Sequence, residues 1–99
     1  VVEDDLVAKP YIDMTLGVMA QFGVRAERDG YRRFRVAGGQ RYRAVADYEV
    51  EPDASSAHYF LAAAAITGGR IGVDGIGTAS LQGDVRFVDV LERMGARVE

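Results

Sequence analysis

The chain has 99 residues, of which 48% are hydrophobic and 27% are charged, values that exclude a disordered, collagen-like or coiled-coil protein. Its formal net charge of −3 gives no positive field for a nucleic-acid backbone or an anionic membrane, so neither is expected as a partner. It contains no cysteine, which excludes disulfides and thiolate metal sites and is consistent with a cytoplasmic location.

The first predicted helix spans residues 10–22. Pro10 suits the first helical turn, and Gly23 follows as a typical stop signal. Apolar or small side chains recur at steps of three and four residues, as on a helix with one buried face (Ile12, Thr15, Leu16, Met19 and Phe22).

A β-hairpin is predicted next. Residues 24–28 and 31–36 have the alternating pattern of half-buried strands, and the dipeptide Asp29-Gly30 between them favours a two-residue turn. A further strand is predicted at about residues 44–50 and ends before Pro52.

The second predicted helix runs from Ala54 to about Thr67. Asp53 is placed to cap its first turn, and Gly68 to end it. Because apolar side chains occur nearly all round this helix, it is predicted to be buried on several sides. Asp53 and the serines after it also allow an anion-binding helix start, but the capping interpretation is favoured because Asp53 would itself repel an anion.

The remaining segment is predicted to contain a strand at residues 70–73, a glycine-rich loop and a helix at about 84–94. Four apolar side chains of this helix are expected to face inward (Phe87, Val88, Leu91 and Met94). The only histidine, His58, is expected to be a packed or surface residue, since no nearby serine and acid would orient it as a base.

An internal repeat is visible at the helix ends. The run MGARVE at residues 94–99 matches FGVRAE at 22–27, so a junction of helix, glycine and strand occurs twice. The fold class is therefore predicted to be α/β (α+β) with a mixed sheet. Strand-like residues at both ends of the sequence lead us to expect a fragment of a longer protein.

Several runs of the sequence resemble the 5-enolpyruvylshikimate-3-phosphate synthase family, in the family's order. They are KPYIDMTL at residues 9–16, FGV at 22–24, GGQ at 38–40, DASSA at 53–57, YFLAAAAI at 59–66, QGD at 82–84 and DVLERMGA at 89–96. The resemblance implies transfer of the enolpyruvyl group of phosphoenolpyruvate to the 5-hydroxyl of shikimate 3-phosphate, with no metal or organic cofactor.

The resemblance also implies a domain organisation. The family is built from repeated β-α-β-α-β-β units, three in each of two domains, with helices on one face of a mixed sheet. Residues 1–50 would end one domain and residues 51–99 would begin the other, with the crossover near 48–53. Both sets of units would be incomplete in this chain.

Two substrate-binding positions are implied by the resemblance. Tyr11 would lie against the shikimate moiety, although a core aromatic is the alternative for a tyrosine on a helix. Ala8 occupies a position where the family commonly has a serine that donates to the substrate phosphate. The family's catalytic aspartate and its phosphoenolpyruvate-binding lysines and arginines match no residue here, so the chain alone is expected to be inactive.

Two alternatives remain. One is a free-standing, non-catalytic α/β module that binds a partner through an exposed sheet edge. The other is a segment of the related UDP-N-acetylglucosamine enolpyruvyl transferase. The unpaired strand edges also predict that the isolated chain self-associates.

Overall fold

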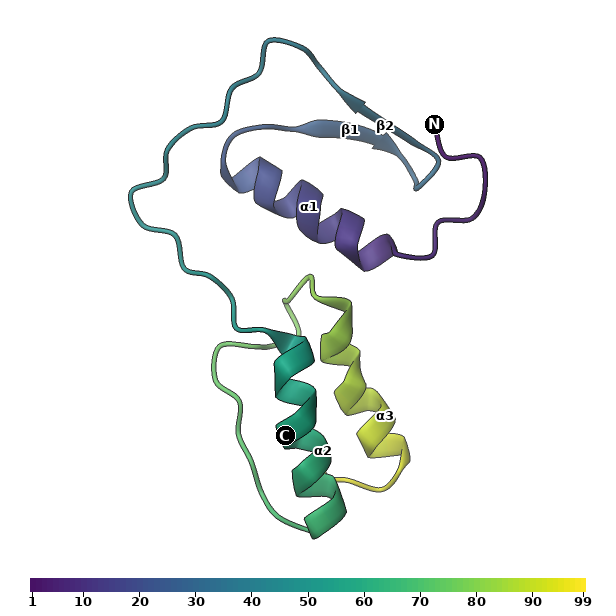
Figure 1. Cartoon of the computed structure of the whole chain (residues 1–99), viewed down its shortest axis with the longest axis vertical. Helices are drawn as coiled ribbons and strands as arrows, with labels where there is room; N and C mark the ends of the chain where they lie inside the picture. Colours follow the sequence, from purple (N-terminus) through teal and green to yellow (C-terminus); the bar gives the residue numbers. More distant parts are fainter. The chain divides into compact units, whose positions relative to one another are not determined.

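The computed structural model describes all 99 residues and divides them into two compact units, residues 1–48 and 49–99 (Figure 1). The chain is a mixed α/β protein with one two-stranded sheet, two α-helices of more than three turns, and a third, shorter helix. This agrees with the predicted fold class at that level. None of the helices has the combined length and apolar character needed to cross a membrane.

The first unit contains helix α1 and a hairpin. Helix α1 is Lys9–Gln21, within one residue of the predicted bounds, and strands β1 (Ala26–Asp29) and β2 (Arg33–Val36) pair antiparallel. Figure 1 shows the hairpin running alongside α1. Val24, between the helix and the hairpin, is buried. The predicted helix and hairpin are therefore confirmed.

The hairpin turn differs from the prediction. Asp29 pairs with Arg33, so the turn has three residues and not two. The backbone groups of Arg32 explain the difference, because its amide donates to the carbonyl of Asp29 (3.1 Å) and its carbonyl accepts from the amide of Val2 (2.8 Å). Since both groups are already bonded, Arg32 belongs to the turn, and β2 begins at Arg33, two residues later than predicted.

The strands predicted at about residues 44–50 and at 70–73 are absent, so these predictions were wrong. A strand exists only when a neighbouring strand satisfies its backbone groups, and neither segment has such a neighbour in this chain. The segment after the hairpin is tied to α1 by other contacts. The amide of Arg43 donates to the carbonyl of Phe22 (2.8 Å), and the rings of Phe22 and Tyr48 lie 5.0 Å apart.

The second unit is helical. Helix α2 is Ala54–Thr67, as predicted, and it contacts a 3-10 turn, η1 (Gly83–Arg86), and helix α3 (Phe87–Arg93). The third predicted helix thus begins as a 3-10 turn, and its regular part is shorter than expected. The buried side chains of this unit are Ala54, Ala57 and Leu91.

The prediction that α2 is buried on several sides was wrong for this chain. Among the helices and strands, η1 and α3 make its main contacts, and Tyr59 and Ile66 keep 80% and 85% of their surface exposed. Met94, expected to face inward, follows the end of α3 and is exposed for the same reason. The apolar surface that the sequence pattern indicated is present, but the chain has no element that covers it.

The glycine-terminated helix ends repeat as the sequence indicated, but the strand expected after the second one is absent. After α1 the amide of Val24 donates to the carbonyl of Met19 (2.9 Å). After α3 the amide of Ala96 donates to the carbonyl of Leu91 (3.0 Å). Gly23 and Gly95 adopt positive φ angles of 85° and 100° between these pairs. Both ends therefore form the same glycine-terminated motif, which accounts for the two matching runs.

Candidate functional site

The two predicted substrate-binding residues lie at the start of α1. Ala8 is the residue before the first helical turn, with φ −93° and ψ 45°, and no side chain caps the helix there. The first four amides of any helix lack intrahelical acceptors, and Pro10 removes one of them here. The remaining amides at this helix start therefore have no side-chain acceptor within the chain.

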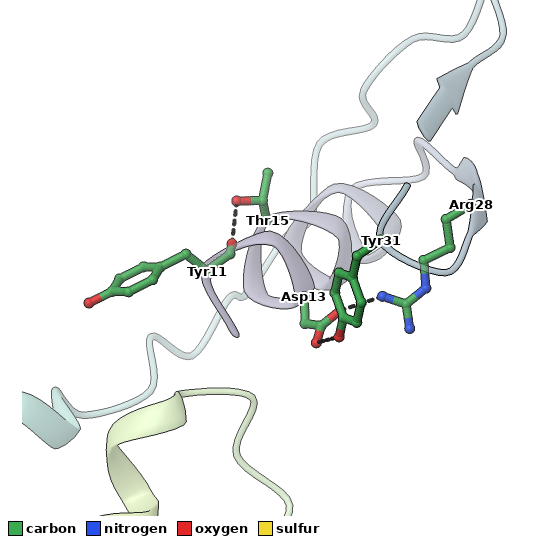
Figure 2. Close-up of polar contacts among 5 residues, drawn as sticks. All are labelled: Tyr11, Asp13, Thr15, Arg28 and Tyr31. Carbon is green, nitrogen blue, oxygen red and sulfur yellow. Dashed lines mark hydrogen bonds and ion pairs between the residues drawn. The ribbon is translucent and has the colours of Figure 1, made fainter. Parts of the chain in front are cut away.

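Tyr11 lies in the first turn of α1 and is 62% exposed, which excludes a core aromatic within this chain. Figure 2 shows its ring pointing away from the helix. The Thr15 hydroxyl donates to the Tyr11 carbonyl at 2.7 Å, which ties its backbone to the next turn. Tyr11 lines a shallow, largely apolar groove with Met14, Thr15, Val18, Met19, Phe22 and Tyr42.

The structure places a polar cluster on another side of the same helix (Figure 2). The Tyr31 hydroxyl donates to Oδ2 of Asp13 at 2.5 Å, and Nη1 of Arg28 donates to Oδ1. Two cations flank the Tyr31 ring, Nζ of Lys9 at 5.6 Å and Cζ of Arg28 at 5.2 Å from its centre. The cluster therefore ties α1 to the tip of the hairpin.

Hydrogen bonding sets the ionisation of this cluster. The hydroxyl of Tyr31, and then the guanidinium of Arg28, hold the pKa of Asp13 below its ordinary value. The same bond to Asp13 raises the pKa of Tyr31, because an ionised tyrosine could no longer donate to the carboxylate. At neutral pH the cluster is therefore a carboxylate held by a neutral phenol and a guanidinium.

Sequence reasoning missed this cluster. Arg28 and Tyr31 lie 15 and 18 residues after Asp13, separations that no local periodicity predicts. One signal was present, because Lys9 and Asp13 are the only charged residues of α1. A lone carboxylate in a helix with only one other charged residue indicates a specific partner elsewhere in the fold.

The start of α2 is closed by side chains from its own unit. Oδ1 of Asp53 accepts the amide of Ser55 at 2.9 Å, and Oδ2 accepts the hydroxyl of Ser56 at 2.6 Å. The side chain of Gln82 accepts the amide of Ala54 at 2.9 Å. The bonds that Asp53 accepts from Ser56 and Ser55, that of the Ser56 hydroxyl foremost, lower the pKa of Asp53. The structure therefore supports the capping interpretation over the anion-binding one.

His58 is a packed residue, as expected. Its Nε2 lies 2.6 Å from the carbonyl oxygen of Asp84, and its ring lies 4.4 Å from that of Phe87, measured between ring centres. No carboxylate orients the imidazole, so the arrangement gives no general base. No group of three or more histidine, aspartate or glutamate side chains is placed to hold a metal ion.

Comparison with known proteins gives one consistent result. The family model described as EPSP synthase (3-phosphoshikimate 1-carboxyvinyltransferase) matches residues 1–99. The chain is 61% identical over 97 residues to the 3-phosphoshikimate 1-carboxyvinyltransferase of Pectobacterium carotovorum subsp. carotovorum, covering 98% of this chain and 23% of that protein.

Proteins of the same name give similar values in other bacteria. The identity is 61% over 95 residues in Sulfurovum sp., with 96% of this chain and 22% of that protein covered. It is 60% over 99 residues in Erwinia tasmaniensis, with 100% of this chain and 23% of that protein covered. The sequence thus spans less than a quarter of the length of these relatives. The chain belongs to the EPSP synthase (3-phosphoshikimate 1-carboxyvinyltransferase) family.

Proposed function

We propose that this chain is a segment of a transferase that moves the enolpyruvyl group of phosphoenolpyruvate to the 5-hydroxyl of shikimate 3-phosphate. The observation that carries the proposal is the family match over all 99 residues, together with about 60% identity to enzymes of that name. In this reaction the hydroxyl oxygen adds to the central carbon of phosphoenolpyruvate while the methylene carbon gains a proton. The tetrahedral intermediate then loses phosphate, and the same carbon gives up a proton to restore the double bond. The charged groups that meet in this segment, Asp13 and Arg28, are paired with each other, so alone the segment is expected to be inactive.

We propose that Tyr11 forms part of the wall against which the shikimate ring lies. Three features support this role: the side chain is exposed, it lines an apolar groove, and its carbonyl is fixed by Thr15. An aromatic ring with a hydroxyl at its edge can cover one face of a cyclic ligand and hydrogen-bond to its substituents.

Ala8 has a different proposed role. Its methyl group cannot donate to a phosphate, so the first amides of α1 would take over the contact that a serine makes at this position. The absence of any side-chain cap on this helix start supports that proposal, because unpaired helix amides favour anions.

We also propose that residues 1–50 end one domain of the transferase and residues 51–99 begin the other, with a crossover near 48–53. The division of the chain into compact units after Tyr48 supports this boundary. The matching helix ends at Gly23 and Gly95 support a fold assembled from repeated β-α-β-α-β-β units on a mixed sheet. Further elements of such units would cover the exposed apolar side of α2.

The alternatives have less support. The relatives described above are all shikimate enzymes, which favours that substrate over a UDP-sugar. A free-standing interaction module would not require a match to these enzymes over 96% or more of this chain.

The cytoplasmic location stays a prediction. Self-association of the isolated chain also stays a prediction, which light scattering would contradict by showing a monomer at high concentration.

A segment exchange tests the proposed function. The matching 97 residues of the Pectobacterium enzyme would be replaced by those of this chain, and phosphate release would be measured with phosphoenolpyruvate and either shikimate 3-phosphate or UDP-N-acetylglucosamine. We expect activity with shikimate 3-phosphate only. A folded hybrid that releases no phosphate with either acceptor would overturn the proposal, and activity with the UDP-sugar would favour the second alternative. The unmodified enzyme is the control.

A further inference from the structure

The first turns of α1 are weakly held by their own residues. No side chain caps the helix. The Lys9 ammonium pairs with Asp5 at 3.2 Å, but that carboxylate is 92% exposed, and such surface pairs contribute little to stability. An uncapped helix start of this kind is expected to fray unless another part of the fold holds it.

The hairpin supplies the missing support. The hairpin follows the end of α1 in the chain, after Gly23. Its tip contacts the beginning of the helix through the bonds that Tyr31 and Arg28 make with Asp13. The amide of Val2 also bonds to the turn, so the segment before the helix is tied to the same tip. The hairpin therefore connects the two ends of α1.

Tyr31 is suited to hold a fixed position. Its bond is made to an ionised carboxylate, and such charge-assisted bonds are shorter and stronger than neutral ones. The two cations near its ring favour one orientation of that ring over the helix. Removal of the hydroxyl alone would break the link to Asp13 and leave the ring in place.

The link leaves the substrate-facing side of the helix free. Asp13 and Tyr11 are two residues apart, so their side chains lie on different sides of α1, and Figure 2 shows them pointing apart. Because both side chains are attached to the same turns of backbone, fixing Asp13 also fixes the direction in which the Tyr11 ring projects.

We propose that Asp13 and Tyr31 are positioning residues that hold the first turns of α1, and with them Tyr11, in the orientation needed to meet the shikimate ring. The role in substrate binding rests on the proposed function, whereas the link between Asp13 and Tyr31 can be tested without it. Neither residue contacts the substrate in this account.

Amide exchange in the full chain tests the link itself. In Tyr31→Phe, exchange at the amides of Asp13 and Met14 is expected to be about tenfold faster, with no change in the last turn of α1 or in α2. Asp13→Asn, which keeps an oxygen acceptor, should lie between the wild type and Asp13→Ala. The control is Glu27→Gln, which alters an exposed cross-strand ion pair. Equal exchange in Tyr31→Phe and wild type, or uniform acceleration throughout the first unit, would overturn the proposal.

Kinetics of the hybrid enzyme test the consequence for substrate. Tyr31→Phe is expected to raise the KM for shikimate 3-phosphate about tenfold and to leave the KM for phosphoenolpyruvate unchanged. In a Tyr11→Ala background the same substitution should change the KM for shikimate 3-phosphate less than about twofold, because the residue it positions is gone. A full tenfold effect in that background, or an equal rise in both KM values, would contradict positioning through Tyr11.

Failure of the proposed function and failure of the positioning role would give different results. A folded but inactive wild-type hybrid would refute the proposed function, and amide exchange would still decide whether Tyr31 holds the helix. An active hybrid in which Tyr31→Phe changes neither exchange nor KM would refute the positioning role and leave the proposed function standing.

Discussion

Helices α1 and α2 begin in opposite ways. At α2, Asp53 and Gln82 accept backbone amides of the first turn, so the polar groups of this helix start are used within the protein. At α1, Ala8 provides no acceptor, and the hairpin holds the helix one turn further along, at Asp13. The difference separates a helix start whose amides are bonded to side chains of the protein from one whose amides have no side-chain acceptor within the chain.

The largest expected effect comes from opening the closed helix start. Gln82→Ala removes the acceptor for the amide of Ala54, which is only 2% exposed, and the donor to the carbonyl of Pro52. Leaving a buried amide unpaired should lower the free energy of unfolding by about 2 kcal/mol, measured by denaturant titration. Gln21→Ala, at the exposed end of α1, is the matched control. A loss no larger than that of the control would show that α2 does not depend on this cap.

A smaller effect is expected from closing the open helix start. Ala8→Ser should cap α1 and restore a donor for the substrate phosphate, lowering the KM of the hybrid enzyme for shikimate 3-phosphate roughly tenfold. Ala20→Ser, at the other end of the helix, should leave it unchanged. If Ala8→Ser leaves this KM unchanged, no phosphate lies at this helix start, and the proposed phosphate contact at this position is wrong.

The smallest effect is the response to pH. The pKa of Asp13 is lowered, first by the bond from Tyr31 and then by Arg28. The ionised carboxylate therefore stabilises the fold above its ordinary pKa of 3.8, and this stabilisation is lost as the pH falls through the folded-state pKa. Asp53 behaves in the same direction because its pKa is also lowered, first by the Ser56 hydroxyl. Below pH 8, circular dichroism should therefore show helix loss only in acid. A transition between pH 5 and 8 would contradict this assignment.

The pH response can also be divided between the two helices. Tyr31→Phe removes the largest cause of the lowered Asp13 pKa and leaves Asp53 untouched. Amide signals of the first turns of α1 should then respond to acid at a higher pH than in the wild type, while those of α2 stay the same. Equal shifts in both helices would show that the two carboxylates do not act locally.

Local chemistry predicted most of the helical structure from the sequence. Asp53 and Gly68 marked the ends of α2, and Gly23 marked the end of α1, because caps depend on a few adjacent residues. The strands near residues 44–50 and 70–73 could not be judged in this way. A strand depends on a partner that lies elsewhere, and this chain provides none for them.

The candidate site also combines features that local sequence predicts with features that depend on distant residues. Tyr11 and Ala8 came from a resemblance of short sequence runs, and the structure places both at one helix start. The cluster at Asp13 could not be found in that way, because it depends on how the hairpin turn is built. The turn has three residues where two were predicted, and its middle residue is Tyr31. The turn is bonded to the amide of Val2, which lies far from it in the sequence, so local sequence rules could not predict its register.

Tyr11→Ala in the hybrid enzyme tests most directly whether the start of α1 faces the shikimate ring. The KM for shikimate 3-phosphate should rise at least about tenfold and the KM for phosphoenolpyruvate should change less than about twofold, because only one substrate meets this part of the wall. An unchanged KM for shikimate 3-phosphate in a folded, active enzyme would contradict the central claim that the start of α1 faces the shikimate ring.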